Sequence, residues 1–324
     1  MINYNKVKYI ELSNTIENLK ENIEKYGVGV IPNVLTSDEC KDAINKANTW
    51  LNYKPVEEND KIKIDDKKSW RNIANVLHGN HGGLIQHFNI GQSQYAWDMR
   101  QNKKVKDIFE VLWNAKDLIV SFDGTNVTPP PEVTNLGWRN QNKMWLHTDQ
   151  SHKKLGLQSV QGLVNLVDVD DSDATLCVLL GSNNLHQKFF DENKLETKND
   201  WYKLKNDTEV KWFLDKGCEL VAIKAPAGSM IFWDSRTIHM GIAPSKERQH
   251  KDRWRYVVYV AMFPRSKLTT KELEKRQKYF KNGRTTNHWG NRLFPKLPRT
   301  YGVAVAKMNP YIEPELNEIG KLLI

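Results

Sequence analysis

Three side chains of this sequence have the types and spacing of a mononuclear metal site. His147 and Asp149 stand two residues apart in Trp145-Leu-His-Thr-Asp149, and His239 ends the stretch Ile231-Phe-Trp-Asp-Ser-Arg-Thr-Ile-His239. In an extended strand, residues two apart project from the same face, so His147 and Asp149 can reach one point in space. Two imidazoles and one carboxylate on one side of a metal leave three coordination positions open, which suits non-haem Fe(II) and oxygen chemistry. A lone His-x-Asp pair also arises by chance on protein surfaces. The sequences that flank this pair and His239 must therefore be considered as well.

The elements that must position these side chains are predicted to be short strands with supporting helices. Short apolar segments separated by Gly and Pro turns are typical of an antiparallel barrel or sandwich. The expected strands are residues 27–32, 117–123, 143–149, 158–169, 174–180, 208–213, 219–224, 230–234 and 254–263. Apolar spacing predicts helices over residues 12–26, 36–53, 94–116, 270–280 and 315–323. Residues 55–70 are expected to form an exposed loop, and residues 185–207 a polar excursion.

The composition indicates what kind of protein this is. The 324 residues, 39% hydrophobic and 27% charged, fit a soluble globular protein with a sizeable core. The sequence contains no apolar run long enough to predict a membrane-spanning helix, and its N-terminus lacks the pattern of a secretory signal. The three scattered cysteines, Cys40, Cys177 and Cys218, show no CxxC spacing and do not predict a disulfide framework. A cytoplasmic protein without membrane association is therefore expected.

Positive charge is concentrated near the C-terminus. The net charge of the chain is +9, whereas Pro264–Lys307 alone contains 12 Lys or Arg against two Glu, a local +10 (12 − 2). Such a segment could attract an anionic substrate, a nucleic acid or an acidic partner, although a solvated basic face is the simpler explanation. A second segment, rich in Gly, carries His78, His81 and His87. These imidazoles could line a pocket mouth or hydrogen-bond to the backbone of a rigid loop.

The order and flanking sequences of the candidate ligands resemble those of a known family. His147-Thr-Asp149, then Leu163–Ser182, then Gly228–His239 are similar to the phytanoyl-CoA dioxygenase (PhyH) family of Fe(II)/2-oxoglutarate oxygenases. The resemblance covers roughly residues 27–263 and implies a double-stranded β-helix (jelly-roll) core, within a mainly β fold with flanking helices (α+β). It implies that His147, Asp149 and His239 bind Fe(II), and that 2-oxoglutarate and O2 are cosubstrates. One domain is expected, with helical support over about 1–116, the core over about 117–263 and a basic extension over about 264–324.

The distal carboxylate of 2-oxoglutarate requires a cation, and the planar fork of an arginine binds a carboxylate in bidentate fashion. Arg255 opens the last apolar strand, where the resemblance places this arginine. Arg253 has the same strand parity and Arg248 lies closer to the last candidate ligand, so both remain alternatives. Gln161 and Asn165 share one strand face and could hydrogen-bond the 2-oxo acid, or they could be satisfied polar residues of the core.

The leading hypothesis is an Fe(II)/2-oxoglutarate-dependent dioxygenase that hydroxylates a substrate while 2-oxoglutarate becomes succinate and CO2. Related halogenases carry a small residue at the carboxylate position, so Asp149 favours hydroxylation. One alternative is a non-catalytic jelly-roll protein that binds a metal or ligand. The other is a nucleic-acid-associated protein that uses the basic segment, although no recognised nucleic-acid-reading motif supports it. The sequence does not choose among small-molecule or anionic substrates.

Overall fold

Two β-sheets dominate a computed structural model that describes residues 6–53, 58–76, 83–86, 89–136, 144–296 and 311–324. His78, His81 and His87 lie outside these residues. The first sheet has the strand order β1 (Lys8–Glu11), β10 (Glu219–Lys224), β8 (Thr175–Leu180), β12 (His239–Ile242), β6 (His147–Thr148) and β9 (Tyr202–Lys203). The second has the order β2 (Val28–Ile31), β11 (Met230–Asp234), β7 (Val160–Asn165), β13 (Arg255–Val260), β5 (Thr125–Thr128) and β3 (Leu84–Ile85).

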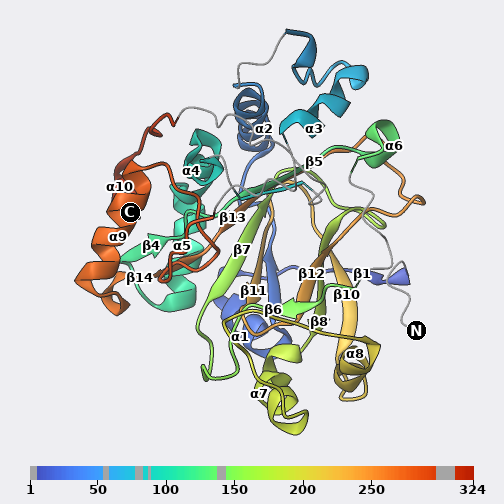
Figure 1. Ribbon diagram of the computed structural model, residues 1–324, viewed down its shortest axis with the longest axis vertical. Coiled ribbons are helices and arrows are strands. Elements are labelled where there is room, and N and C mark those ends of the chain that lie inside the picture. The colour runs from blue at the N-terminus through green and yellow to red at the C-terminus, as the bar shows by residue number, and fades with distance from the viewer. Residues whose placement is uncertain (1–5, 54–57, 77–82, 87–88, 137–143, 297–310) are drawn as a thin grey trace.

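Eight of these strands form a jelly roll. Along the chain, β5, β7, β11 and β13 contribute to the second sheet, whereas β6, β8, β10 and β12 contribute to the first. The pairings among these eight strands are antiparallel, and the inner faces pack through an apolar layer that includes Leu163, Val178 and Trp233. This alternation confirms the expected double-stranded β-helix and the mainly β fold with flanking helices. The two sheets are seen nearly side by side in Figure 1.

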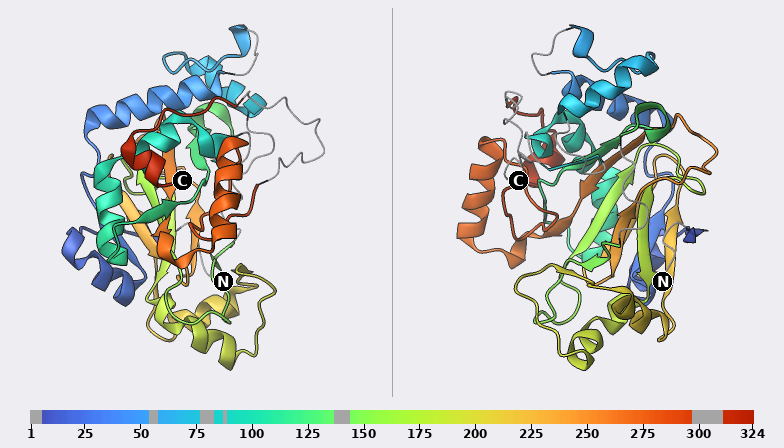
Figure 2. Two further views of the ribbon diagram at one scale, coloured as in Figure 1. Left: turned by 90° about the vertical axis from the view of Figure 1, so that its left-hand side faces the viewer. Right: turned by 45° about the vertical axis from the view of Figure 1, so that its right-hand side comes forward.

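Helices cover the outer faces of both sheets (Figures 1 and 2). The second sheet packs against the N-terminal helices, where Phe109 meets Phe232 of β11 edge to face at 5.4 Å. The first sheet packs against α7 (Ser182–Glu192) and α8 (Asp207–Leu214), whose Phe189 and Phe213 rings lie 4.7 Å apart in one cluster with Leu179 of β8. The helices are α1 (Ile16–Tyr26), α2 (Ser37–Leu51), α3 (Ile73–Val76), α4 (Gln94–Arg100), α5 (Lys103–Trp113), α6 (Pro131–Thr134), α7 (Ser182–Glu192), α8 (Asp207–Leu214), α9 (Thr270–Lys281) and α10 (Glu318–Leu322).

The predicted strand over residues 208–213 is wrong, because this segment is helix α8. The side chain of Asn206 caps the helix by accepting a hydrogen bond from the backbone N–H of Glu209. Val210 and Phe213, three residues apart, then bury the same helix face, a spacing that the short apolar run disguised. The polar excursion over residues 185–207 likewise contains most of α7, whose Phe189 and Phe190 are buried.

The basic extension is built onto the core. A two-stranded sheet joins β4 (Leu118–Val120) to β14 (Met262–Pro264), and α9 and α10 lie beside it in Figure 1. None of the helices in the described ranges is both long enough and apolar enough to cross a membrane. The three cysteines are buried and unbridged, as the absence of a disulfide pattern predicted.

Candidate metal centre

Two neighbouring strands bring the three predicted ligands together. His147 of β6 and His239 of β12 are direct cross-strand partners, so their imidazoles project from adjacent positions of one sheet face. Asp149 follows β6 immediately, and its backbone N–H donates to the carbonyl of Ser235 at 3.1 Å. One ligand atom from each of the three side chains lies within 4.8 Å of the other two. All three residues are buried at the base of a cavity.

The hydrogen bonds of the two imidazoles aim their free nitrogens at one point. Nδ1 of His147 lies 3.0 Å from the carbonyl of Trp145, and Nδ1 of His239 lies 2.9 Å from that of Thr237. A carbonyl can only accept, so each Nδ1 carries the proton and each Nε2 keeps its lone pair for a metal. These Nε2 atoms lie 3.8 Å and 3.4 Å from oxygens of Asp149.

The ionisation states of the centre suit a cation. Burial lowers the pKa of His147 to about 3, helped by the nearby His239 and opposed by Asp149, so the ring is neutral. Burial alone would raise the pKa of Asp149, but the charge and the hydrogen-bonding contact of His288 oppose it, and that pKa lies well below its usual value. Two imidazoles and one carboxylate, converging without a thiolate, fit Fe(II) with open positions.

The predicted polar residues of β7 lie in different places. Gln161 lines the main cavity, and its amide Nε2 donates to Oδ2 of Asp149 at 3.0 Å. It therefore contacts a candidate ligand. Asn165 instead donates to the carbonyl of Ala225 at 3.3 Å and lines a smaller neighbouring cavity.

The three candidate arginines have different surroundings. Arg248 is buried and paired with Glu132 at 2.7 Å, and Arg253 is paired with Asp170 and Asp173, each at 2.7 Å. Arg255 lines the main cavity, and its buried Nε has no hydrogen-bond partner within the described part of the chain. A half-buried guanidinium whose buried Nε–H lacks a partner among the described residues, beside a cavity, fits an anionic ligand.

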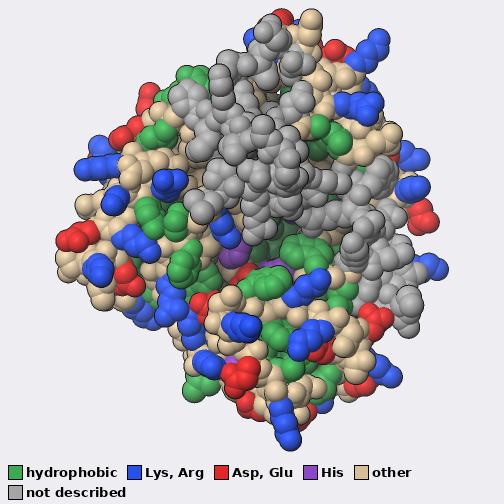
Figure 3. All heavy atoms as spheres, in the orientation of Figure 1, with side chains coloured by type: hydrophobic (Ala, Val, Ile, Leu, Met, Phe, Trp, Pro, Cys, Tyr) green, Lys and Arg blue, Asp and Glu red, His purple; other side chains and the backbone are tan. Residues whose placement is uncertain are grey.

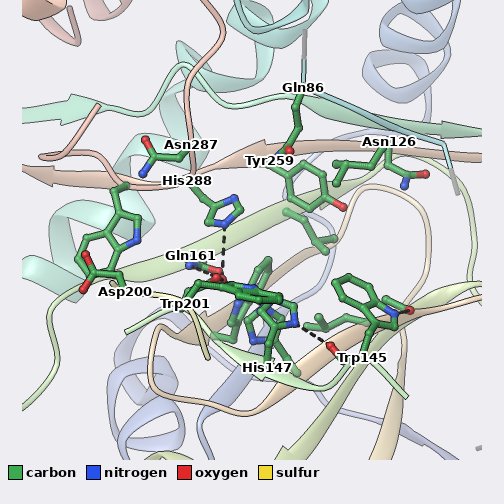
Figure 4. A pocket seen from close by; sticks show the side chains of 18 of the residues that line it. Gln86, Asn126, Trp145, His147, Gln161, Asp200, Trp201, Tyr259, Asn287 and His288 are labelled. Carbon is green, nitrogen blue, oxygen red and sulfur yellow. Dashed lines mark hydrogen bonds and ion pairs between the residues drawn. The ribbon is translucent and has the colours of Figure 1, made fainter. Parts of the chain in front are cut away.

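A large cavity opens above the three ligands. Its volume is about 1100 Å³. Trp145 stacks on His147 with ring centroids 4.9 Å apart, and Trp201 covers the same imidazole from 5.8 Å. In Figure 3, histidine side chains show at the bottom of a hollow bordered by hydrophobic and by Lys and Arg side chains. Figure 4 shows Trp201, His147 and Trp145 along the base of the cavity and Tyr259, Asn126 and Gln86 above them.

The C-terminal extension forms part of this cavity, which sequence reasoning missed. Nε2 of His288 lies 3.4 Å from Oδ2 of Asp149, and its Nδ1 lies 3.0 Å from Oδ2 of Asp123. Burial opposes protonation of His288, but these two carboxylates outweigh it and raise its pKa to about 10. The only signal in the sequence was a cluster of His and Trp after a basic helix, with no spacing to a ligand. The extension residues that line the cavity are Asn287, His288, Trp289, Arg292, Phe294 and Lys296.

Comparisons with known proteins show the family to which the chain is similar. The model of the family described as phytanoyl-CoA dioxygenase (PhyH) matches residues 23–247, which include all three ligands. "Ava biosynthesis cluster protein O" of Aspergillus versicolor is 24% identical over 280 residues, covering 84% of this chain and 86% of that protein. Among solved structures, the non-haem α-ketoglutarate-dependent carbocyclase SnoK from nogalamycin biosynthesis is 16% identical with a TM-score of 0.49, covering 78% of this chain and 86% of that one. EctD from S. alaskensis, solved with 2-oxoglutarate and 5-hydroxyectoine, is 12% identical with a TM-score of 0.48, covering 76% and 75%.

Proposed function

The chain belongs to the phytanoyl-CoA dioxygenase family, and we propose that it acts as an Fe(II)/2-oxoglutarate-dependent oxygenase through His147, Asp149 and His239. The observation that carries these roles is the cross-strand pairing of the two histidines, with the carboxylate two residues beyond the first. Bound Fe(II) would supply a Lewis acid with open positions for a chelating 2-oxo acid and for O2. The family implies that 2-oxoglutarate becomes succinate and CO2.

The chain's own residues bind the cosubstrate and protect the centre. Arg255 is the proposed partner of the distal carboxylate of 2-oxoglutarate, because Arg248 and Arg253 are held in ion pairs. Gln161 orients Asp149 through its amide N–H. Trp145, fixed by its indole N–H on the carbonyl of Gly241 at 2.9 Å, excludes water from one side of the ligands. A dry site strengthens the charged contacts made inside it.

The reaction outcome that we propose is hydroxylation. Asp149 has its carboxylate held by Gln161 beside both imidazoles, so this position already supplies a protein oxygen ligand. A chloride would need a vacant position there, as the small residue of related halogenases provides. Product analysis by mass spectrometry in chloride buffer should therefore find added oxygen and no added chlorine.

The substrate that we propose is an anionic small molecule with a planar or aromatic part. The cavity has the volume of a large ligand pocket, and its lining includes four tryptophans: Trp145, Trp201, Trp233 and Trp289. Lys153 and Lys154 at its wall are paired with Glu196 and Asp200. Lys198 and Lys296 also line it, and no ion pair within the described ranges involves either of them. Aromatic faces, together with ammonium groups that form no ion pair within the described part of the chain, favour a flat anion.

An anaerobic titration tests the proposed function. Adding Fe(II) and then 2-oxoglutarate should produce a metal-to-ligand charge-transfer band, and admitting O2 with substrate should yield succinate. A non-catalytic metal-binding protein would bind the metal without forming succinate. Screening succinate formation with aromatic carboxylates and phosphates, matched neutral aromatics and oligonucleotides would identify the substrate class. Preference for neutral compounds would contradict an anionic substrate, and oligonucleotide binding that falls steeply with salt would favour the nucleic-acid alternative.

A further inference from the structure

We propose that His288 is a positioning residue of the metal centre, which holds the carboxylate of Asp149 in the orientation that metal binding requires. This inference rests on the proposed function. The imidazole of His288 lies between two buried carboxylates, with Nδ1 3.0 Å from Asp123 and Nε2 3.4 Å from Asp149. Figure 4 shows this ring above the base of the cavity, directed at the carboxylate beside Gln161.

The position of the ring is fixed by its anchor, Asp123. The side chain of Asp123 is buried, and its Oδ1 accepts a hydrogen bond from the backbone N–H of Gly124 at 2.6 Å. The buried guanidinium of Arg100 donates to the carbonyl of Asp123 at 2.7 Å. One oxygen of Asp123 is therefore held by the backbone, and the other remains to orient the imidazole of His288.

Backbone contacts also fix the segment that carries His288. The N–H of Thr286 donates to the carbonyl of Phe122 at 2.7 Å, directly before Asp123. The guanidinium of Arg276, buried in α9, donates to the carbonyls of Gly290 at 2.8 Å and of Val120 at 2.6 Å. These contacts join the extension on both sides of His288 to the strand that precedes Asp123.

The contacts of Asp149 indicate what His288 does. Oδ2 of Asp149 lies 3.0 Å from the amide of Gln161 and 3.4 Å from Nε2 of His288, whereas Oδ1 faces His147. The amide N–H of Gln161 donates to this oxygen and the imidazole of His288 lies against it, so the two side chains together restrict rotation of the carboxylate. The convergent ligand atoms within the described residues belong to His147, Asp149 and His239, so His288 stands beside the ligand set. Partners that orient a ligand typically change metal affinity about 10- to 100-fold when they are removed.

Metal affinity, measured without turnover, tests this role. Co(II) binding to the metal-free full chain would be measured by anaerobic calorimetry, with the thermal midpoint of each metal-free variant recorded alongside. His288→Ala should weaken Co(II) binding about 10- to 100-fold. His288→Gln, which keeps an N–H donor, should recover part of that loss. Arg284→Ala is the matched control, because Arg284 is an exposed cation of the same segment and should leave the affinity unchanged.

Asp123→Asn provides a second route to the same conclusion if His288→Ala does not fold. The asparagine keeps the shape of the anchor but weakens its hold on the imidazole, so Co(II) affinity should fall by less than in His288→Ala. Co(II) binding by His288→Ala that equals or exceeds the wild-type affinity would overturn the proposal, as would an equal loss in Arg284→Ala. A wild-type protein that binds no Co(II) and forms no succinate would instead refute the proposed function.

Discussion

The cavity has two walls of different origin. One wall consists of jelly-roll strands and carries the three candidate ligands and Gln161, all within the residues matched by the family model. The other wall is the C-terminal segment from Asn287 to Lys296, which lies outside that match. The strand wall contains the candidate metal ligands and Arg255, the proposed partner of the cosubstrate, whereas the extension wall adds Trp289, Arg292, Phe294 and Lys296 to the lining. The family match therefore accounts for the candidate ligands and Gln161 but not for the extension wall, so the two walls can be tested separately.

The extension also shows that a basic segment need not be a charged surface. Arg276 of α9 is buried, and its guanidinium donates only to backbone carbonyls in the described residues. His288 faces two carboxylates inside the cavity. Lys296 lines the cavity, while Lys278 lies on the exposed face of α9. Part of the local +10 therefore stabilises the fold and shapes the site, and the rest remains at the surface.

The largest effect is expected from the strand wall. His147→Ala or Asp149→Ala should abolish succinate formation, because each removes one of the three ligand atoms that converge among the described residues. Far-UV circular dichroism should show that the fold persists. Lys203→Ala is a suitable control, because Lys203 is an exposed residue that pairs with His147 in the sheet. Undiminished turnover in both variants would show that His147 and Asp149 are not the metal ligands.

Arg255→Gln should weaken the binding of 2-oxoglutarate without removing a metal ligand. Hydrogen bonds to charged groups contribute about 1.5–3 kcal/mol, so the KM for 2-oxoglutarate should rise about 10- to 100-fold. Steady-state succinate formation at varied 2-oxoglutarate measures this change. Arg253→Gln breaks ion pairs with Asp170 and Asp173 and should lower the thermal midpoint without a comparable change in KM. Equal KM changes in both variants would place the cosubstrate cation elsewhere.

Arg276→Met tests whether the extension wall depends on its internal anchor. The substitution leaves three carbonyls, those of Val120, Gly290 and Leu323, without their guanidinium donor. The carbonyl of Leu323 still accepts from the N–H of Val120 at 3.1 Å, but loss of the guanidinium donor from the carbonyls of Val120 and Gly290 should lower the free energy of unfolding by about 3 kcal/mol, measured by urea denaturation. Lys278→Met on the exposed face of the same helix should change it by less than about 0.5 kcal/mol. If the two variants are equally stable, the buried guanidinium does not hold the extension in place.

Much of the strand wall could be predicted because its information is local. Parity within a strand placed His147 and Asp149 on one face, and the turns around each apolar run marked most strands correctly. The segment 208–213 failed because Val210 and Phe213 are too few to distinguish a helix from a strand, whereas the cap at Asn206 depends on a polar residue of ordinary type. Short apolar runs are ambiguous in this way.

The extension wall could not be predicted because its contacts are between distant residues. His288 reaches Asp123 across 165 positions of the chain, and Thr285 accepts a hydrogen bond from the N–H of Gly91 across 194. No spacing rule connects such pairs, since the fold of the core decides where the extension lies. A positive local charge was visible, but the direction in which each cation points was not. From the sequence, Gln161 could contact the 2-oxo acid or be a satisfied polar residue of the core, and no spacing rule indicates its hydrogen bond to Asp149.

Phe294→Ala has the smallest expected effect, and it tests whether the extension wall contributes to substrate binding. It lines the cavity and is 57% exposed, so Phe294→Ala should change the free energy of unfolding by no more than about 0.5 kcal/mol. Aromatic pairs contribute about 0.5–1.5 kcal/mol beyond burial, which predicts a roughly 2- to 12-fold rise in the KM of an aromatic substrate found by the succinate screen. Val111→Ala, an exposed apolar residue of α5, controls for loss of surface hydrophobicity. If Phe294→Ala alters KM while Val111→Ala does not, substrate preference resides in the extension wall; if neither does, the strand wall selects the substrate as well as the reaction.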